Sequence, residues 1–264
     1  MTPDRDGELL AVEELVKHFR GVRALDGVNL HVSEDTSFGV IGPNGAGKTT
    51  LFNLINGIDE PTAGVIRFAA RDITGMAPHR VSGLGIGRTF QTSRLFGHLT
   101  ALQNLLVAQQ GQARSNLLTL LVPRPRRERR LRAEARDLLD SFGLGELSGQ
   151  LAGRLPYGSR RRLEIARALA TRPRVLLLDE PAAGMLPTEA AALAQEIRRL
   201  RERAVTVLLI EHQMSVVMSV CDRIAVLNFG NKIAEGTPAE IQADPTVIDA
   251  YLGSGDAPAV EQGA

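Results

Sequence analysis

A glycine-rich segment, residues 42–50, constrains the fold of this chain more than any other feature. It reads Gly42-Pro-Asn-Gly-Ala-Gly-Lys-Thr-Thr50 and matches the pattern G-x-x-x-x-G-K-[ST]. The apolar run Ser37–Ile41 precedes it, and a helical pattern over Lys48–Asn56 follows it. This context predicts a loop between a buried strand and a helix, in which backbone N–H groups surround phosphate oxygens.

The side chains of this loop have separate predicted tasks. Glycines allow the backbone N–H groups to turn inward. We expect Lys48 to bridge the β- and γ-phosphates of ATP, and the hydroxyl of Thr49 to bind Mg²⁺, which prefers oxygen ligands. The residues that we expect to bind nucleotide here are Gly42, Asn44, Gly45, Gly47, Lys48, Thr49 and Thr50.

A second apolar run, Val175–Leu178, is followed directly by the carboxylates Asp179 and Glu180. Adjacent side chains of a strand point to opposite sides, so these two carboxylates have different predicted tasks. We expect Asp179 to hold Mg²⁺ through water. Glu180 is the candidate general base that polarises the attacking water.

The order of the patterns favours an α/β fold with a parallel sheet. Predicted buried strands are Ser37–Ile41, Val175–Leu178 and Val205–Ile210, and predicted helices are Lys48–Asn56 and Glu189–Arg203. Further strand patterns at Val28–Val32 and Val65–Phe68 predict an antiparallel flap beside the main sheet. Helical periodicity over Leu99–Gln110 and Glu128–Phe142 predicts an inserted helical lobe.

These patterns predict one ATPase domain over residues 1–264. Residues 9–91 and 161–253 are assigned to the nucleotide-binding core, and residues 92–160 to the helical lobe. Residues 254–264 are rich in Gly, Ala and polar residues and are predicted to be disordered.

Composition excludes several classes of protein. A formal net charge of +1 provides no global field for nucleic acid, and we expect no nucleic-acid partner. A single cysteine, Cys221, excludes a disulfide framework. The polar N-terminal residues do not resemble a signal peptide, and no window has about 18 consecutive apolar residues, so we expect no membrane span.

With these motifs in order, the chain resembles the ATPase subunits of ABC transporters over about residues 9–253. The resemblance implies a P-loop NTPase core with a RecA-like parallel sheet. It implies that Gln91 reaches the metal and the water, that His212 contacts the γ-phosphate, and that Phe19 stacks on adenine. P-loop kinases and GTPases share the phosphate loop but lack the later strand that ends in Asp-Glu-Pro.

Several segments resemble the branch that imports branched-chain amino acids. The segment Leu155-Pro-Tyr-Gly-Ser-Arg-Arg-Arg-Leu-Glu-Ile-Ala-Arg-Ala168 stands where the family has its signature, which implies nucleotide contacts from Gly158 and Ser159. Similar branch features are Leu95-Phe96, Asn104–Ala108, Glu180–Gly184, Glu235–Pro238 and Ala250–Leu252.

The chain also departs from the family pattern at four positions. Pro156 stands in place of the signature serine, and Ser159 in place of the signature glutamine. Leu186 replaces the usual Asn or Asp before a proline, and Gln213 follows His212 where Asp is common. These changes raise the prospect of a partly defective ATP site, whereas the lysine, the carboxylates and the histidine are retained.

The resemblance implies ATP and Mg²⁺ as cofactors, and a peripheral location on the cytoplasmic face of the plasma (inner) membrane. Implied partners are two membrane permease chains, a second ABC ATPase subunit in a hetero- or homodimer, and indirectly an external solute-binding protein. Three alternatives stay open: the ATPase of a urea or amide importer or a lipopolysaccharide exporter, a soluble ABC ATPase outside transport, and a regulatory subunit that does not hydrolyse ATP.

Overall fold

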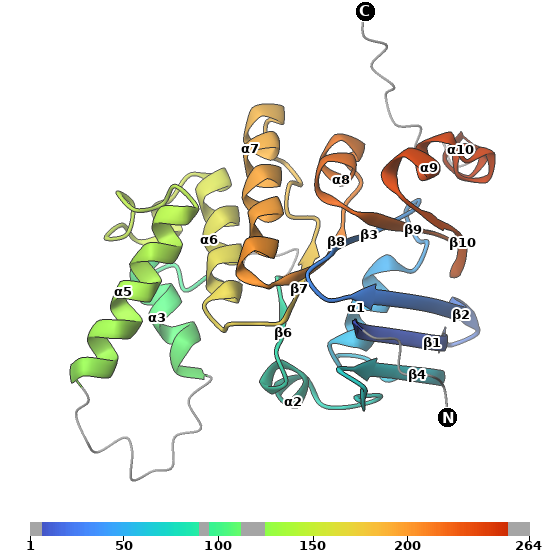
Figure 1. Cartoon of the computed structure of the whole chain (residues 1–264), viewed down its shortest axis with the longest axis horizontal. Coiled ribbons are helices and arrows are strands. Elements are labelled where there is room, and N and C mark those ends of the chain that lie inside the picture. Colours follow the sequence, from blue (N-terminus) through green and yellow to red (C-terminus); the bar gives the residue numbers. More distant parts are fainter. Residues whose placement is uncertain (1–6, 90–94, 112–124, 253–264) are drawn as a thin grey trace, which may run out of the picture.

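The computed structural model describes residues 7–89, 95–111 and 125–252, and its centre is a six-stranded sheet (Figure 1). Five of these strands run parallel, and β10 pairs antiparallel with β9 at one edge. In spatial order the strands are β10 (Asn231–Gly236), β9 (Arg223–Asn228), β3 (Ser37–Ile41), β8 (Thr206–Ile210), β7 (Val175–Asp179) and β6 (Ile86–Arg88).

A second, antiparallel sheet of four strands lies beside the large sheet, as the predicted flap requires. Its strands, in spatial order, are β2 (Val22–Ser33), β1 (Glu8–Phe19), β4 (Ala63–Phe68) and β5 (Arg71–Asp72). Buried residues of this sheet share one core with α1 (Lys48–Ile55) and with one face of the large sheet. The phosphate-loop helix is therefore held between the two sheets.

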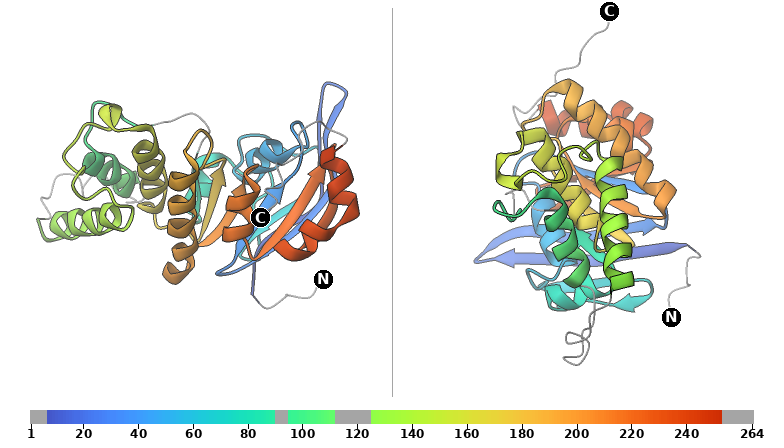
Figure 2. Two further views of the ribbon diagram at one scale, coloured as in Figure 1. Left: turned by 90° about the horizontal axis from the view of Figure 1, so that it is seen from above. Right: turned by 90° about the vertical axis from the view of Figure 1, so that its left-hand side faces the viewer.

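Apart from α2, whose buried Val81 joins the core that contains α1, the remaining helices divide between the other face of the large sheet and a separate lobe. Helices α3 and α5 lie at the end of the molecule farthest from the small sheet, beyond α6 (Figure 1; Figure 2). The helices are α2 (Pro78–Gly83), α3 (Ala101–Gly111), α5 (Pro125–Ser141), α6 (Tyr157–Leu169), α7 (Pro187–Arg198), α8 (Met214–Val220), α9 (Pro238–Ala243) and α10 (Pro245–Leu252), with short 3₁₀ helices at Ala152–Arg154 and Arg199–Arg203.

Strand β7 illustrates why the central strands read as continuous apolar runs. All of its residues are buried. Val175 and Leu177 join the core that contains α1, whereas Leu176 and Leu178 join the core that contains α6 and α7. Because side chains alternate along a strand, Asp179 continues the row that faces α1. Glu180 follows the strand with φ 49°, so the alternation ends at Asp179. The alternation inferred from the sequence therefore holds along β7 as far as Asp179.

The predicted elements are confirmed with small shifts at their ends. The helix expected over Glu189–Arg203 begins earlier, at Pro187, and its last turn, Arg199–Arg203, is a 3₁₀ helix. The division expected between residues 160 and 161 falls inside α6, which contacts α3 and α5 on one side and β6 and β7 on the other. The division expected at residue 92 and the tail at 254–264 lie outside the described residues. Within the described ranges, no helix combines the length and apolar character needed to cross a bilayer.

Candidate functional site

The phosphate loop connects the end of β3 to the start of α1, as the sequence predicts. Gly42 has φ 145° and Gly47 has φ 102°, values that favour glycine. A Cβ atom at Gly42 would lie 2.0 Å from the carbonyl oxygen of Leu227, and one at Gly47 would lie 2.5 Å from that of Ala24. The loop is thus so tightly enclosed by backbone that side chains are excluded at both positions.

Lys48, the first residue of α1, is buried and folds back over this loop. Its Nζ donates hydrogen bonds to the carbonyl oxygens of Gly42, at 2.7 Å, and Pro43, at 2.9 Å. The ammonium group is therefore held inside the curve of the loop, where the chemistry suits a phosphate. Thr49 is exposed and Thr50 half-buried in the first turn of the same helix, and Asn44 and Gly45 are exposed at the tip of the loop.

The turn between β9 and β10 supports the phosphate loop from behind, a contact that is not among the sequence predictions. The amide of Gly230 donates to Ala46 at 3.1 Å, and the carbonyl of Gly230 accepts from the amide of Asp26 at 2.9 Å. The neighbouring Phe229 has an 83% exposed side chain and, with Asn44 of the loop, lines a cavity of about 270 Å³. In the sequence, the available signal for this turn was the pair Phe229-Gly230 between two apolar runs.

Asp179 ends β7 in a buried position, where its two carboxylate oxygens have different surroundings. Oδ2 accepts a hydrogen bond from Nη2 of Arg88 at 3.0 Å, and these two side chains are 1% and 5% exposed. Oδ1 is buried and has no hydrogen-bond partner within the described parts of the chain. A buried carboxylate oxygen without a donor is suited to a hard cation or to a water bound to it.

Glu180 follows in a backbone conformation that non-glycine residues seldom adopt, with φ 49°. Its amide donates to the carbonyl of Ile210 on β8 at 2.9 Å, which ties the turn after β7 to the neighbouring strand. The carboxylate is 28% exposed. Strained backbone at a candidate general base is a pattern associated with functional sites.

His212 follows β8 and is more exposed than Glu180. Its Nδ1 lies 4.0 Å from Oε1 of Glu180 and 3.6 Å from Oε1 of Glu211. The structure thus brings together the two residues, 32 positions apart in the chain, that the resemblance places around the γ-phosphate. Of the other predicted residues, Phe19 is 42% exposed at the end of β1, with Nζ of Lys17 at 4.6 Å from its ring centre. Gln91 lies outside the described residues.

Glu211 is a structural residue of this site that is absent from the sequence predictions. It is fully buried, and burial raises the pKa of its carboxyl group. Oε2 accepts from the amide of Ala182 at 3.2 Å, and Oε1 accepts from the amides of His212, at 3.1 Å, and Gln213, at 3.3 Å. Glu211 therefore links the segment after Glu180 to the segment that carries His212. A charged residue directly after an apolar strand was the available signal.

Gln213, an apparent departure from the family pattern, takes part in the same link. Its Nε2 donates to the carbonyl of Ala182 at 3.2 Å. The amide side chain supplies a donor that an aspartate lacks. The substitution thus joins the two segments by one more hydrogen bond.

The segment that carries Gly158 and Ser159 forms the first turn of α6. Pro156 stands at its N-cap, and Gly158 is buried while Ser159 is half-buried. The Tyr157 hydroxyl donates to the carbonyl of Ala183 at 2.7 Å and accepts from Nε of Arg161 at 3.0 Å. The start of α6 is therefore tied to the loop that follows Glu180 in the same chain.

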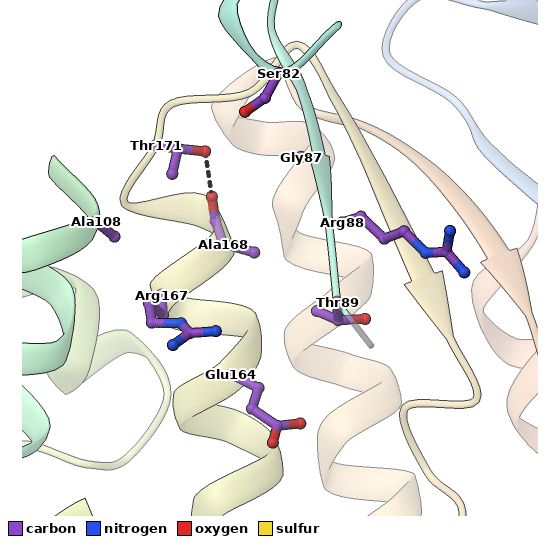
Figure 3. Close-up of a pocket in the computed structure, with 9 residues that line it drawn as sticks. All are labelled: Ser82, Gly87, Arg88, Thr89, Ala108, Glu164, Arg167, Ala168 and Thr171. Atoms are coloured by element: carbon purple, nitrogen blue, oxygen red, sulfur yellow. Dashed lines mark hydrogen bonds between the residues drawn. The ribbon is translucent and has the colours of Figure 1, made fainter. Parts of the chain in front are cut away.

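A cavity of about 160 Å³ lies where the lobe meets the core (Figure 3). Glu164 and Arg167 of α6 line it on one side and Thr89, directly after β6, on the other, whereas Arg88 projects from β6 away from α6. Its other lining residues are Ser82, Gly87, Ala108, Ala168 and Thr171. The end of β6 thus lies between the lobe boundary and the carboxylate of Asp179.

Comparisons with known proteins agree with this geometry. Residues 25–183 match the family described as ABC transporter. The chain belongs to the ABC transporter ATP-binding family. Residues 231–257 of this ABC ATPase also match the family described as branched-chain amino acid ATP-binding cassette transporter. The protein therefore binds ATP, and hydrolysis of this ATP is coupled to transport.

Individual relatives of this ABC ATPase match over nearly its whole length. It is 48% identical over 249 residues to the high-affinity branched-chain amino acid transport ATP-binding protein BraF of Pseudomonas aeruginosa, covering 93% of this chain and 98% of BraF. It is 44% identical to LivG of Escherichia coli K12, with the same coverage. An ABC transporter cassette in its ADP conformation has a TM-score of 0.82 at 34% identity, covering 93% of this chain and 99% of that chain. The predicted fold and family are confirmed.

Proposed function

We propose that this ABC ATPase drives an importer of branched-chain amino acids from the cytoplasmic face of the membrane. The relatives named above that transport these amino acids are matched from end to end, and the C-terminal match at residues 231–257 favours the same branch. The observation that carries the catalytic part is the convergence of Lys48, Asp179, Glu180 and His212 at one end of the large sheet. Open α/β sheets bind their ligands at the carboxyl ends of parallel strands.

In this proposal the phosphate loop and α1 hold the nucleotide. The buried ammonium of Lys48 exchanges the carbonyl oxygens of Gly42 and Pro43 for phosphate oxygens. The residues present fit Mg²⁺: Thr49 is exposed, and Asp179 Oδ1 is buried without a donor among the residues that the structure describes. When bound there, Mg²⁺ would offset the negative charge of the phosphates.

Glu180 and His212 act on the γ-phosphate side in this proposal. Glu180 accepts a proton from the attacking water, and its half-open position leaves room for that water. His212 donates a hydrogen bond to the γ-phosphate. Glu211, buried between the two segments, holds both in place through backbone amides. Gln91 is proposed to contact the metal and the water, and Phe19 the adenine.

We further propose that the nucleotide is shared with a second ATPase subunit and that the lobe docks on a permease. Gly158 and Ser159 at the start of α6 would contact the nucleotide held by the partner. Phe96 and Val107 of the helical lobe are 46% and 43% exposed. Exposed apolar side chains of this kind can pack against an amphipathic helix, and a cytoplasmic helix of one of the two permeases is the proposed occupant.

The test is transport by the reconstituted complex. The chain would be purified with its two permeases and second ATPase, placed in proteoliposomes, and supplied with the solute-binding protein and labelled leucine. ATP-dependent leucine accumulation that is lost in Lys48→Ala supports the proposal. Accumulation of urea or short amides without leucine, or export of lipopolysaccharide, would refute the substrate assignment while leaving the ATPase assignment in place.

A further inference from the structure

The side chain of Arg88 joins three parts of the ATPase core through hydrogen bonds. Nη1 donates to Oδ1 of Asn53 on α1 at 2.8 Å, and Nη2 donates to Oδ2 of Asp179 at 3.0 Å. Its guanidinium carbon lies 5.7 Å from the ring centre of Phe52. Arg88 therefore spans from the phosphate-loop helix, across the end of β6, to the carboxylate that ends β7.

The ion pair with Arg88 holds one of the two carboxylate oxygens of Asp179. A carboxylate rotates freely about its last bond unless a directional partner holds it. Here the guanidinium holds Oδ2, and the pair is so deeply buried that water does not compete for it. Oδ1 is left buried without a hydrogen-bond partner among the described residues. The orientation of the proposed metal ligand is thus decided by Arg88.

Thr89, the next residue, restrains the backbone of the same strand end. Its amide donates to the carbonyl of Leu177 at 2.9 Å, and its hydroxyl accepts from the amide of Asp179 at 3.3 Å. Arg88 and Thr89 together hold Asp179 by side chain and by backbone. Arg88 and Thr89 lie three and two positions before Gln91, so the segment that leads to Gln91 also positions the carboxylate.

We propose that Arg88 is a positioning residue for the metal of the nucleotide site, acting through Oδ2 of Asp179 so that Oδ1 is presented to Mg²⁺. The inference rests on the proposed role of Asp179. Partners that orient a metal ligand from outside contribute about 10–100-fold to metal affinity. Arg88 fits that role better than a purely structural one, because its guanidinium binds this carboxylate and also Asn53 on the helix that carries Lys48.

The experiment measures how much Mg²⁺ strengthens nucleotide binding by the full-length chain. The dissociation constant of a fluorescent, non-hydrolysable ATP analogue is measured with Mg²⁺ and with EDTA, and the ratio of the two constants is compared between variants. Since the ratio is taken within one protein, a fraction of misfolded molecules does not alter it. Arg88→Gln is expected to reduce the ratio by about 10–100-fold, with most of the loss in the binding measured with Mg²⁺.

Three further variants make the test specific. Arg88→Lys keeps the charge but cannot reach both Asn53 and Asp179, so it should give an intermediate ratio. Arg174→Gln is the matched control, because Arg174 pairs at the surface with Glu34, and it should retain the wild-type ratio. Asp179→Asn should abolish the Mg²⁺ effect, and adding Arg88→Gln to it should change nothing more.

The outcomes separate the inference from the proposal beneath it. An unchanged ratio in Arg88→Gln would overturn the positioning role, and an increased ratio would show that Arg88 instead competes with the metal. If Asp179→Asn keeps the full Mg²⁺ effect, the role of Asp179 itself is wrong.

Discussion

Nδ1 of His212 and Oε1 of Glu180 lie 4.0 Å apart where β8 and β7 end. In these parallel strands Asp179 is in register with Ile210, so the residues that follow this pair emerge at the same edge of the sheet. The amide of Glu180 bonds to the carbonyl of Ile210, and the buried Glu211 binds amides on both sides. The proximity of His212 to Glu180 is therefore held by backbone.

Glu180→Gln should abolish most hydrolysis while preserving ATP binding. The amide keeps the shape of the side chain but cannot accept the proton of the attacking water, which costs about 10²–10⁴-fold in rate. ATP turnover of the assembled complex and nucleotide affinity are the measurements. Glu146→Gln, at an exposed glutamate of the lobe, is the control. Undiminished turnover in Glu180→Gln would remove Glu180 from the role of general base.

The two ATP sites of a heteromeric transporter should be unequal because of Pro156. This residue caps α6 without a hydroxyl or an N–H group, so it supplies fewer donors to the nucleotide bound by the partner subunit. Losing one or two charge-assisted hydrogen bonds weakens closure there by about ten- to a thousandfold. The site built by Lys48, Asp179 and Glu180 is expected to be the competent one.

The asymmetry is measured from the ATPase rates of two single-site variants of the complex. Glu180→Gln here should remove most turnover, and the equivalent change in the partner should remove little. Pro156→Ser should strengthen nucleotide-driven dimer closure more than Pro156→Ala, which restores only the N–H group. If the partner's change alone stops turnover, the asymmetry has the opposite sense.

Leu186→Asp should stabilise the fold. Leu186 is the N-cap of α7, its side chain is 66% exposed, and it has no oxygen to accept from the first helical turn. Glu189 compensates in part by accepting from the Leu186 amide at 3.1 Å. A capping aspartate is expected to raise the free energy of unfolding by about 0.5–2 kcal/mol, measured in urea. Leu186→Ala, which removes the apolar side chain without adding a cap, should not reproduce the gain.

The stability of the contact between α6 and α7 should fall as pH rises towards neutrality. Oε2 of Glu196 lies 3.6 Å from Nε of Arg162, and burial raises the pKa of Glu196 from 4.5 to about 7. A carboxyl whose folded pKa is raised retains its proton in the native state, so its stabilising effect is present at low pH and is lost as pH rises through about 7.

Glu196→Gln should remove this dependence, because an amide does not ionise. Relative to wild type, the variant should gain about 1–3 kcal/mol in free energy of unfolding between about pH 5 and pH 8. Denaturant titrations at both pH values provide the measurement, with Glu146→Gln as the control. A parallel pH profile for wild type and Glu196→Gln would contradict the assignment.

Cys221 should react with thiol reagents only after unfolding. Burial, with a smaller contribution from Asp222, raises the pKa of its thiol from 9.0 to about 12. At about pH 8 the reactive thiolate is then roughly a thousandfold scarcer than in an unfolded chain, apart from the barrier to access. Labelling followed against denaturant should coincide with loss of circular dichroism. Rapid labelling of the native protein would show that the strand end beside Cys221 opens locally.

Much of the fold could be predicted because local rules suffice for it. Apolar runs such as Val175–Leu178 indicate strands buried on both faces. The pattern at residues 42–50 is specific for a phosphate-binding loop between a strand and a helix. Strand periodicity also predicted separate roles for Asp179 and Glu180, although Glu180 leaves the strand conformation directly after β7. The small sheet and the lobe were also predicted, although the hairpin of β9 and β10, whose turn supports the phosphate loop, was not.

The sequence by itself determined which chemical groups are available: a phosphate loop, a lysine, two carboxylates after one strand, and a histidine after another. Only the tertiary structure decided their partners. The local sequence does not distinguish Arg88, which lies three positions before Gln91. The pairing of β6 with β7 places the Arg88 side chain against Asp179. Glu211 likewise reads as a charged turn residue, yet it is buried among three amides. Periodicity predicts the face on which a side chain lies, but the neighbour across that face comes from distant parts of the chain and depends on strand order and packing.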